Sequence, residues 1–263
     1  MATYTIGTGE TYETLTLAEA SLTLPEAGGT IYNITGTVVD SITLSDANYS
    51  NGLIVNAKAG EEADGRTNGA NLNGTITVNV VSTFNNLNIA KFNNQGSSEQ
   101  IDCNNCDFGN GVIGGNIYSW GGASFALNTN CILRDASGSN ASSNFQNVNV
   151  LFNSCTSIGA NSNGFRRCRV SNSLALQNSP DFNGLMTGSD YIASGDSTAT
   201  TTNAFTGRTT SDLVDYAGGD YNLALGSGMT GAGAGGVNIG AVLAAASGAS
   251  IIPQIMHHRR QMQ

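Results

Sequence analysis

The sequence predicts an all-β fold in which short strands stack as the rungs of a solenoid, and three observations support this prediction. Short runs of Val, Ile, Leu and Phe recur at roughly 20 to 25 residues, the length of one solenoid coil. The 34 glycines, together with frequent Asn, Ser and Thr, suit tight corners between such runs. Charged residues make up 11% of the chain, against about a quarter in an average soluble protein, whereas apolar residues reach 40%. One elongated domain with a surface of amides and hydroxyls is therefore expected.

Residues 14–22 form the one segment with a helical pattern. Leu15, Ala18 and Leu22 recur at steps of three and four residues, which places them on one face of a helix. Thr16 and Glu19 have the spacing of a capping box at its start. Such a helix would cover the open end of a β-stack, where unpaired backbone groups otherwise invite association.

Brief β-prone runs separated by Gly, Asp and Asn begin at residue 28, as expected for strands between corners. A polar insertion at 58–71 is predicted to be a loop that stands off the coil. The Asn pairs at 85/86, 93/94 and 104/105 are predicted to lie near corners, because Asn tolerates left-handed backbone angles. The main later runs are 76–80, 87–90, 107–108 with 112–113, 131–133, 148–152, 168–170 and 173–176.

The stretch from Asp220 to Ala241 is predicted to close the stack with a last apolar strand and a Gly-Ala step. The expected organisation is therefore an N-terminal cap at 1–27, a β-helix at 28–241 and an extended C-terminal arm at 242–263.

These features together resemble the right-handed parallel β-helix repeat proteins, the group that includes pectate lyases and phage tailspikes. The resemblance covers nearly the whole chain. It implies an all-β, single-stranded right-handed parallel β-helix with a short N-terminal capping helix and an extended C-terminal tail. The same scaffold carries lyases, hydrolases and structural proteins, so it does not decide an activity. The lean composition and the short basic tail also resemble β-helical virion proteins of tailed bacteriophages, some of them tailspikes and others trimeric capsid decoration or cement proteins.

The net charge and the hydropathy of the chain limit which kinds of partner are expected. A net charge of -9 and a pI near 4.4 oppose binding to phosphate backbones, so no nucleic-acid partner is expected. No apolar run reaches the roughly 20 residues that span a bilayer, so no membrane partner is expected. The first residues lack the basic and apolar regions of a signal peptide, which predicts synthesis in a host cytoplasm. Five cysteines in that setting are expected to be reduced thiols packed inside.

Two arrangements of charged residues are candidates for polysaccharide chemistry. The stretch 166–169 holds three arginines, of which Arg167 and Arg169 face outward if strand alternation holds, unless the alternation breaks there. Stacked rungs lie about 4.8 Å apart, so Asp102 or Asp107 in one coil is a candidate carboxylate partner for Asp135 in the next. Local capping of corners is the alternative role for these aspartates, and a solvated or inter-subunit patch is the alternative for the arginines. No catalytic residue is assigned.

Metal and cofactor sites are not expected. The cysteines at 103 and 106 have CxxC spacing, but no second pair accompanies them, and the only histidines lie near the end of the chain. Cys106, Cys131 and Cys155 recur at near-rung spacing, which favours thiols that point inward.

Two groups of residues are candidate contacts with partners. Tyr118 and Trp120 could form a small patch for stacking against a glycan. The tail combines apolar anchors with potential cations, which in an acidic protein is unusual and suggests an arm that binds a sister subunit or another virion protein. A frayed end is the alternative reading of the tail. The tail residues expected to bind the partner are Ile251, Ile252, Ile255, Met256, His257, His258, Arg259 and Arg260.

Three functions follow as hypotheses. The first is a non-enzymatic virion protein of a tailed phage, a homotrimer that decorates or cements the capsid and contacts the major capsid protein or another virion protein. A tailspike or tail-fibre-like protein with depolymerase activity is the second, and a glycan-binding module without catalysis is the third. The virion, with the capsid surface ahead of the tail, is the expected location.

Overall fold

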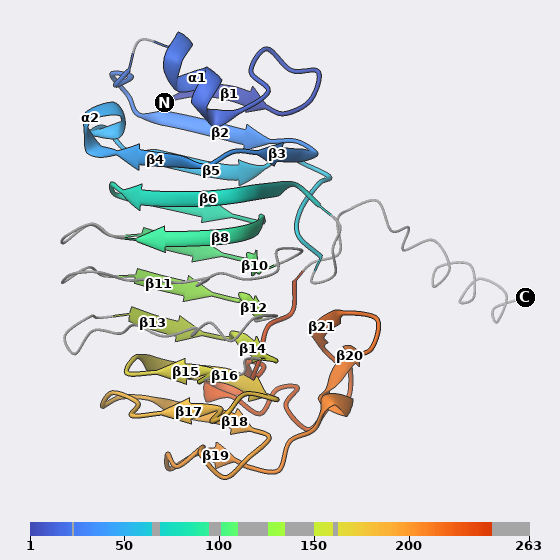
Figure 1. Cartoon of the computed structure of the whole chain (residues 1–263). Coiled ribbons are helices and arrows are strands. Elements are labelled where there is room, and N and C mark those ends of the chain that lie inside the picture. Colours follow the sequence, from blue (N-terminus) through green and yellow to red (C-terminus); the bar gives the residue numbers. More distant parts are fainter. Residues whose placement is uncertain are drawn as a thin grey trace, which may run out of the picture.

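The chain winds into a parallel β-helix, which confirms the predicted fold class (Figure 1). The computed structural model describes residues 1–22, 24–64, 69–94, 101–109, 126–134, 150–159 and 163–243. The strands of the stack pair in parallel with strands of neighbouring rungs, and they lie on three faces. We call these the first, second and third face.

The first face runs almost the full length of the stack. Its strands pair in continuous register, so that Ile31 lies beside Ile54 and Leu127 lies beside Leu151. The stack begins earlier than predicted, because the first strand precedes the helix and pairs with the second strand. The strands of this face are β1 (Ala2–Ile6), β2 (Thr30–Ile34), β5 (Leu53–Ala57), β7 (Ser82–Asn85), β9 (Ile101–Asn104), β11 (Ala126–Thr129), β13 (Val150–Asn153) and the first half of β16 (Arg169–Leu176).

A sharp corner leads from each of these strands to the second face. Its strands are β3 (Thr37–Val39), the first half of β6 (Asn71–Asn79), the start of β8 (Asn88–Asn94), β10 (Asp107–Phe108), β12 (Ile132–Arg134), β14 (Thr156–Ile158), the second half of β16, β18 (Asp190–Ser194) and β19 (Ala204–Phe205). The third face holds β4 (Ile42–Ser45), the second halves of β6 and β8, and a separate pair, β15 (Phe165–Arg166) and β17 (Phe182–Asn183).

Alternating side chains point into the stack and form the inner core. In β2 and β5 the buried positions alternate with half-buried ones, as the period of a strand requires. Aromatic side chains stack from rung to rung in the lower half: the ring centroids of Phe152 and Phe165 lie 5.2 Å apart, and those of Phe165 and Phe182 lie 5.5 Å apart. These separations are typical of favourable aromatic pairs.

Helix α1 (Leu15–Ser21) covers the N-terminal end of the stack, as predicted (Figure 1). Leu15 and Ala18 are buried in the core below it. The predicted capping box is wrong, because the N-cap lies two residues earlier: Thr14 is the N-cap and accepts a hydrogen bond from the backbone N–H of Leu17 at 3.1 Å. The Thr16 hydroxyl instead donates to Asp40 at 2.8 Å. A second short helix, α2 (Asp46–Tyr49), follows β4.

The insertion after β5 packs against the stack where it is described, contrary to the prediction of a loop that stands off. Ala63 and Ala70 are buried, and the backbone N–H of Ala63 donates to the carbonyl of Asn86 at 2.8 Å. The carboxylate of Glu61 accepts hydrogen bonds from Thr35 and Gly36. These contacts hold the insertion on the rungs.

The C-terminal segment, residues 209–243, does not form the closing rung that the sequence predicted. It leaves the stack after β19 and returns along the outside of the second face (Figure 1). It contains η1 (Thr210–Asp212), an antiparallel hairpin of β20 (Leu213–Asp215) and β21 (Asp220–Leu223), and η2 (Ala234–Gly236). The sequence predicts a last strand from the apolar residues of 220–241, but these residues cover a sheet face instead.

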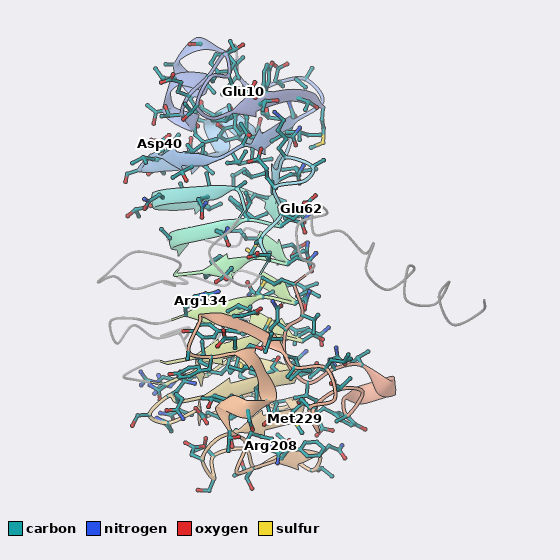
Figure 2. All side chains as sticks on the ribbon, turned by 90° about the vertical axis from the view of Figure 1, so that its right-hand side faces the viewer. Glu10, Asp40, Glu62, Arg134, Arg208 and Met229 are labelled. Carbon is teal, nitrogen blue, oxygen red and sulfur yellow. The ribbon has the colours of Figure 1, made fainter. Side chains whose placement is uncertain are left out.

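This returning segment creates a second, outer core. Ile158, Leu174 and Leu176 point outward from the second face yet are at most 2% exposed. They are covered by side chains of the C-terminal segment, including Met229, which lies against the lower rungs (Figure 2). The residues that cover them are Leu213, Leu223, Met229 and Ile239. Among the described residues no helix has the length and apolarity to cross a membrane.

Candidate functional site

Asparagine side chains form a hydrogen-bonded ladder along the corner between the first and second faces. The amide of each residue donates to the amide oxygen of the one a rung earlier, at 3.3 Å from Asn56 to Asn33, 2.9 Å from Asn85 to Asn56 and 3.0 Å from Asn104 to Asn85. Because these side chains pair with one another, they fasten successive rungs.

A second ladder lies at the next corner position, where the backbone is left-handed. Asn86, Asn105 and Asn130 have φ of 60°, 53° and 53°, which Asn tolerates better than most residues. The Asn105 amide donates to Asn86 at 3.0 Å, and that of Asn130 donates to Asn105 at 2.8 Å. The predicted corner roles of the pairs 85/86 and 104/105 are therefore confirmed. Asn93 and Asn94 are the last two residues of β8 and pair with β6, and the residues that follow them lie outside the described ranges, so their corner role stays a prediction.

The corner also anchors residues 234–243, which we call the strap. Asn130 makes two hydrogen bonds of 2.7 Å with Val242, one to its backbone N–H and one to its carbonyl. One rung further, the hydroxyl of Thr156 accepts from the N–H of Ala241 at 2.8 Å. Asn172 accepts from Ala234 through its side chain and from Gly240 through its carbonyl. Side chains from three rungs thus bind one segment that crosses them.

A buried ion pair lies beside the strap on the second face. Asp107 in β10 and Arg134 in β12 face outward on neighbouring rungs, and Nε and Nη2 of Arg134 donate to the two carboxylate oxygens at 2.7 and 2.5 Å. Asp107 has no exposed surface. Burial raises the pKa of Asp107 to about 6, although Arg134 acts to lower it. The same attraction raises the pKa of Arg134.

The hairpin β20–β21 closes over this pair. Arg134 lies over the ring of Tyr221, with its guanidinium carbon 4.4 Å from the ring centroid, and Nη1 donates to the carbonyl of Gly219 at 2.9 Å. Figure 2 shows Arg134 at the edge of the C-terminal segment. Asp107 was a sequence candidate for carboxylate catalysis with Asp135, but it is sealed beneath the hairpin, and Asp135 lies outside the described residues. The position of Asp107 instead indicates that it holds the hairpin through Arg134.

The five cysteines point inward as free thiols, as predicted. Cys106, Cys131 and Cys155 occupy matching positions on consecutive rungs, because the residues that follow them pair in register. Burial raises the pKa of the thiols of Cys131 and Cys168, which disfavours the reactive thiolate. No cluster of three or more metal-binding side chains occurs within the described ranges.

A pair of aspartates that the sequence reading missed lies at a lower corner. Asp181 accepts hydrogen bonds from the backbone N–H groups of Gly195 at 2.7 Å and Asp196 at 3.3 Å, and Asp196 accepts from that of Asp181 at 3.1 Å. Burial raises the pKa of Asp181. Because their oxygens are occupied by backbone donors, these carboxylates hold a corner, which is the role that local capping predicts for aspartate.

The arginine cluster breaks the strand alternation, as one of the two alternatives predicted. Arg167 has φ of 49° and is half-buried, Cys168 is buried, and Arg169 is exposed at the start of β16. The left-handed turn at Arg167 leaves Arg166 and Arg167 both half-buried.

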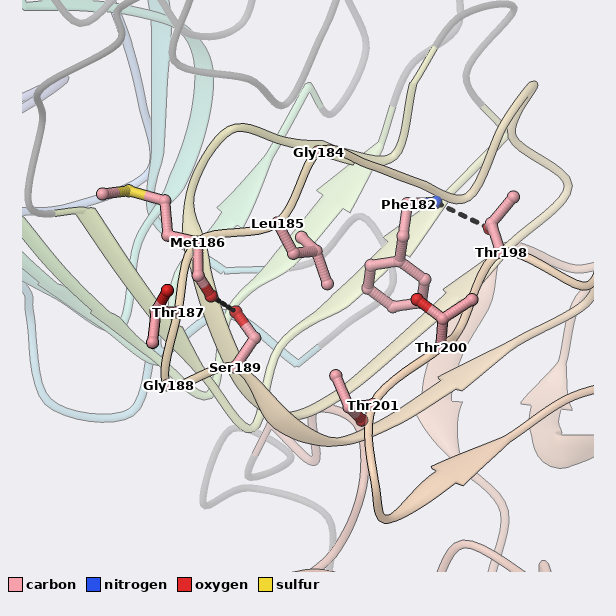
Figure 3. Close-up of a pocket in the computed structure, with 10 residues that line it drawn as sticks. All are labelled: Phe182, Gly184, Leu185, Met186, Thr187, Gly188, Ser189, Thr198, Thr200 and Thr201. Carbon is pink, nitrogen blue, oxygen red and sulfur yellow. Dashed lines mark hydrogen bonds between the residues drawn. The ribbon is translucent and has the colours of Figure 1, made fainter.

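A pocket of about 400 Å³ lies one rung below this cluster (Figure 3). Phe182 and Leu185 form its apolar part, and threonines from the stretch before β19 face them (Figure 3). Two hydroxyl groups at its edge are already bonded: that of Thr198 accepts from the N–H of Phe182 at 2.9 Å, and that of Ser189 donates to the carbonyl of Met186 at 2.8 Å. The sequence offered no motif for this pocket, since its residues come from two different rungs.

Asp102 lies in β9 and is half-buried, while its proposed partner Asp135 is outside the described residues. The other sequence candidates also lie outside the described residues. This applies to Tyr118 and Trp120 and to every tail residue proposed to bind a partner, from Ile251 to Arg260. Those assignments therefore stay predictions.

Comparison with protein-family models gives no match, and neither does comparison with curated proteins or with solved structures. The fold and the geometry described above are accordingly the basis for a functional proposal.

Proposed function

We propose that this protein is a structural, self-associating β-helix, a homotrimer that decorates or cements the capsid of a tailed phage. The observation that carries the self-association is the outer column of the first face. Its members on consecutive rungs, in register, are Thr3, Ile31, Ile54, Thr83, Asp102, Leu127, Leu151 and Arg169.

Aliphatic side chains occur in this column in two adjacent pairs, on a flat face of the stack. Leu127 is 37% exposed, and Ile31, Ile54 and Leu151 are half-buried. If copies associate in parallel around an axis along the stack, each rung meets its own equivalent and the aliphatic pairs form common layers. Burying these side chains removes apolar area from water, which stabilises the association by about 25 cal/mol per Å² buried.

The polar groups of the described residues support a structural role as well. The asparagine ladders, the buried ion pair and the lower aspartate corner all fasten one part of the fold to another. The capsid setting is supported by the sequence resemblance to β-helical virion proteins.

The oligomeric state tests the first part of the proposal. In sedimentation velocity the purified chain is expected to be a trimer, and the double variant Leu127→Glu/Leu151→Glu is expected to be a monomer with an unchanged circular dichroism spectrum. Val39→Glu is the matched control, because Val39 is 67% exposed but lies on the second face. A monomeric wild type, or dissociation by Val39→Glu as well, would contradict this interface.

Location in a particle tests the second part. Electron microscopy of purified particles that contain the chain is expected to show density of three-fold symmetry at the capsid surface. Density confined to the tail would contradict the cement role and favour the tail-fibre alternative.

A further inference from the structure

We propose that Asn183 is a site of spontaneous deamidation in the folded chain, where its side-chain amide is converted to a carboxylate beside the arginine cluster at 166–169. This inference does not depend on the oligomeric state or on the virion role. Asparagine followed by glycine is prone to this reaction, because glycine has no side chain to obstruct attack by its own backbone nitrogen. The Asn–Gly pairs that the structure describes are 51–52, 73–74, 163–164 and 183–184.

The reaction needs an available N–H on the glycine and access for water. The backbone nitrogen of Gly184 attacks Cγ of Asn183, the new C–N bond closes a succinimide ring, and Nδ2 leaves as ammonia with the proton of the attacking N–H. Water then adds to one of the imide carbonyls and opens the ring to aspartate or isoaspartate. Ring closure joins neighbouring residues and is therefore intramolecular. A hydrogen bond that occupies the attacking N–H must first break, which slows ring closure about ten-fold.

The fold opposes this reaction at the other described pairs. The N–H of Gly52 donates to the last carbonyl of α2 at 2.8 Å, and that of Gly164 donates to the carbonyl of Pro180 at 2.9 Å. Gly74 lies inside β6, so close to the carbonyl oxygen of Asp40 that no room for a side chain remains. Its backbone therefore cannot move to meet the side chain of the preceding asparagine.

The pair 183–184 differs in each of these respects. Asn183 is the last residue of the short strand β17, and both Asn183 and Gly184 are exposed. Within the described part of the chain, no hydrogen bond engages the N–H of Gly184. Gly184 also lines the pocket of about 400 Å³ beside β17 (Figure 3). The attacking nitrogen is therefore available, and water reaches the ring that it forms.

An arginine lies where the charge of the product appears. Asn183 in β17 pairs in register with Arg166 in β15, so the two side chains project from the same side of neighbouring rungs. The amide of Asn183 now donates to Oδ1 of Asn163 at 2.6 Å. A carboxylate at this position cannot donate that bond, but it accepts hydrogen bonds from a guanidinium. Deamidation therefore exchanges an amide contact between rungs for an ion pair and makes the net charge of -9 more negative by one.

Peptide mapping of the folded protein after incubation in mildly alkaline buffer tests the proposal, because alkali promotes attack by the backbone nitrogen. Trypsin places the pairs in separate peptides, namely 1–58, 67–91, 135–166 and 170–208. Asn183 is expected to convert about ten-fold faster than Asn51 or Asn163, as measured by chromatography of the aspartate and isoaspartate peptides. In urea, where the hydrogen bonds of Gly52 and Gly164 are lost, the rates are expected to converge.

Asn183→Gln and Asn51→Gln are matched variants, since glutamine keeps an exposed amide but does not close the same ring. Isoelectric focusing of the incubated wild type is expected to show a new acidic band, which Asn183→Gln lacks and Asn51→Gln retains. The proposal would be overturned by an unchanged Asn183, by conversion of another described pair at an equal rate in the folded chain, or by an equal preference for Asn183 in urea.

Discussion

The inner and outer cores of this molecule are built from the same kinds of side chain but are held together differently. The inner core is enclosed by strands that pair with one another through backbone hydrogen bonds, rung after rung. The outer core lies between the second face and the C-terminal segment, whose hairpin pairs only with itself. Side chains of the rungs, such as Asn130, Thr156 and Arg134, supply polar contacts to that segment, together with a backbone hydrogen bond from Gly240 to the carbonyl of Asn172.

This difference has a consequence for sensitivity to substitution. A backbone ladder survives most changes of side chain, since every residue except proline carries its own donor and acceptor. A segment held by particular side chains, in contrast, loses a contact when one of those side chains is replaced. The outer core is therefore expected to open locally at single substitutions that leave the rungs folded.

Arg134→Met is expected to have the largest effect. It leaves Asp107 buried without its partner and removes the donor to Gly219, so the free energy of unfolding is expected to fall by about 3–5 kcal/mol. Urea denaturation measures this loss. Lys58→Met, which removes an exposed ion pair with Glu10, is expected to cost less than about 1 kcal/mol.

The double variant Asp107→Leu/Arg134→Met separates loss of the pair from burial of a lone charge. It is expected to recover much of the stability, because replacement of a buried pair by apolar groups is often tolerated. Equal losses for Arg134→Met and Lys58→Met would show that the hairpin does not depend on the pair.

Ile239→Ala and Ile192→Ala compare the two cores directly, because both side chains are fully buried. Each is expected to cost about 2–5 kcal/mol from lost burial and the cavity that remains. Hydrogen exchange is expected to separate them: Ile239→Ala should speed exchange in residues 213–243 alone, whereas Ile192→Ala should speed it in β16 and β18. Faster exchange throughout the rungs in Ile239→Ala would show that the two cores unfold as one unit.

The repeating parts of the fold were predictable from sequence, and the returning segment was not. Period-two runs and corner asparagines are local signals, so they predicted the rungs, the inward cysteines and the corner positions of the pairs 85/86 and 104/105. The apolar residues of 220–241 carry no sign of which surface they cover. Their partners, such as Leu174, looked like ordinary strand residues, because a strand buried on both faces reads as a continuous apolar run.

The sites depended even more on tertiary structure. Asp107 was predicted to pair with Asp135 or to cap a corner, but it binds Arg134, which lies 27 residues away and which no spacing rule connects with it. The pocket beside Phe182 draws residues from two rungs and was missed altogether. The reciprocal capping of Asp181 and Asp196 likewise required the register of two corners.

Acidification is expected to affect Asp107 and Asp190 with opposite signs. Asp107 binds its proton with a pKa of about 6 in the folded chain, against 3.8 unfolded, so its contribution to the free energy of unfolding rises as pH falls from about 6 to about 4, by at most about 3 kcal/mol. Hydrogen bonds from Asn203 lower the pKa of Asp190, so its contribution is present above the unfolded pKa and is lost as pH falls through the folded value.

Urea denaturation at pH 7 and pH 5 measures this difference. Relative to Asp107→Asn, the wild type is expected to gain stability on going from pH 7 to pH 5. Relative to Asp190→Asn, it is expected to stay level over the same range. A loss relative to Asp107→Asn would mean that the attraction of Arg134 outweighs burial.

Asn130→Gly is expected to have the smallest effect and to show most directly how the strap is held. Glycine adopts the left-handed backbone of this corner without strain, so the substitution removes the two hydrogen bonds to Val242 and that to Asn105 while the corner keeps its shape. The expected cost is about 1–2 kcal/mol, with faster exchange at Val242.

Asn105→Gly is the matched control for Asn130→Gly. Asn105 has the same φ of 53° and belongs to the same ladder, but its side-chain bonds run to Asn86 and Asn130. It is expected to weaken the ladder and leave exchange at Val242 unchanged. If both variants speed exchange at Val242 equally, the strap is held by the shape of the corner. If Asn130→Gly alone does so, the amide itself binds the strap, and the outer core depends on side chains where the inner core depends on backbone.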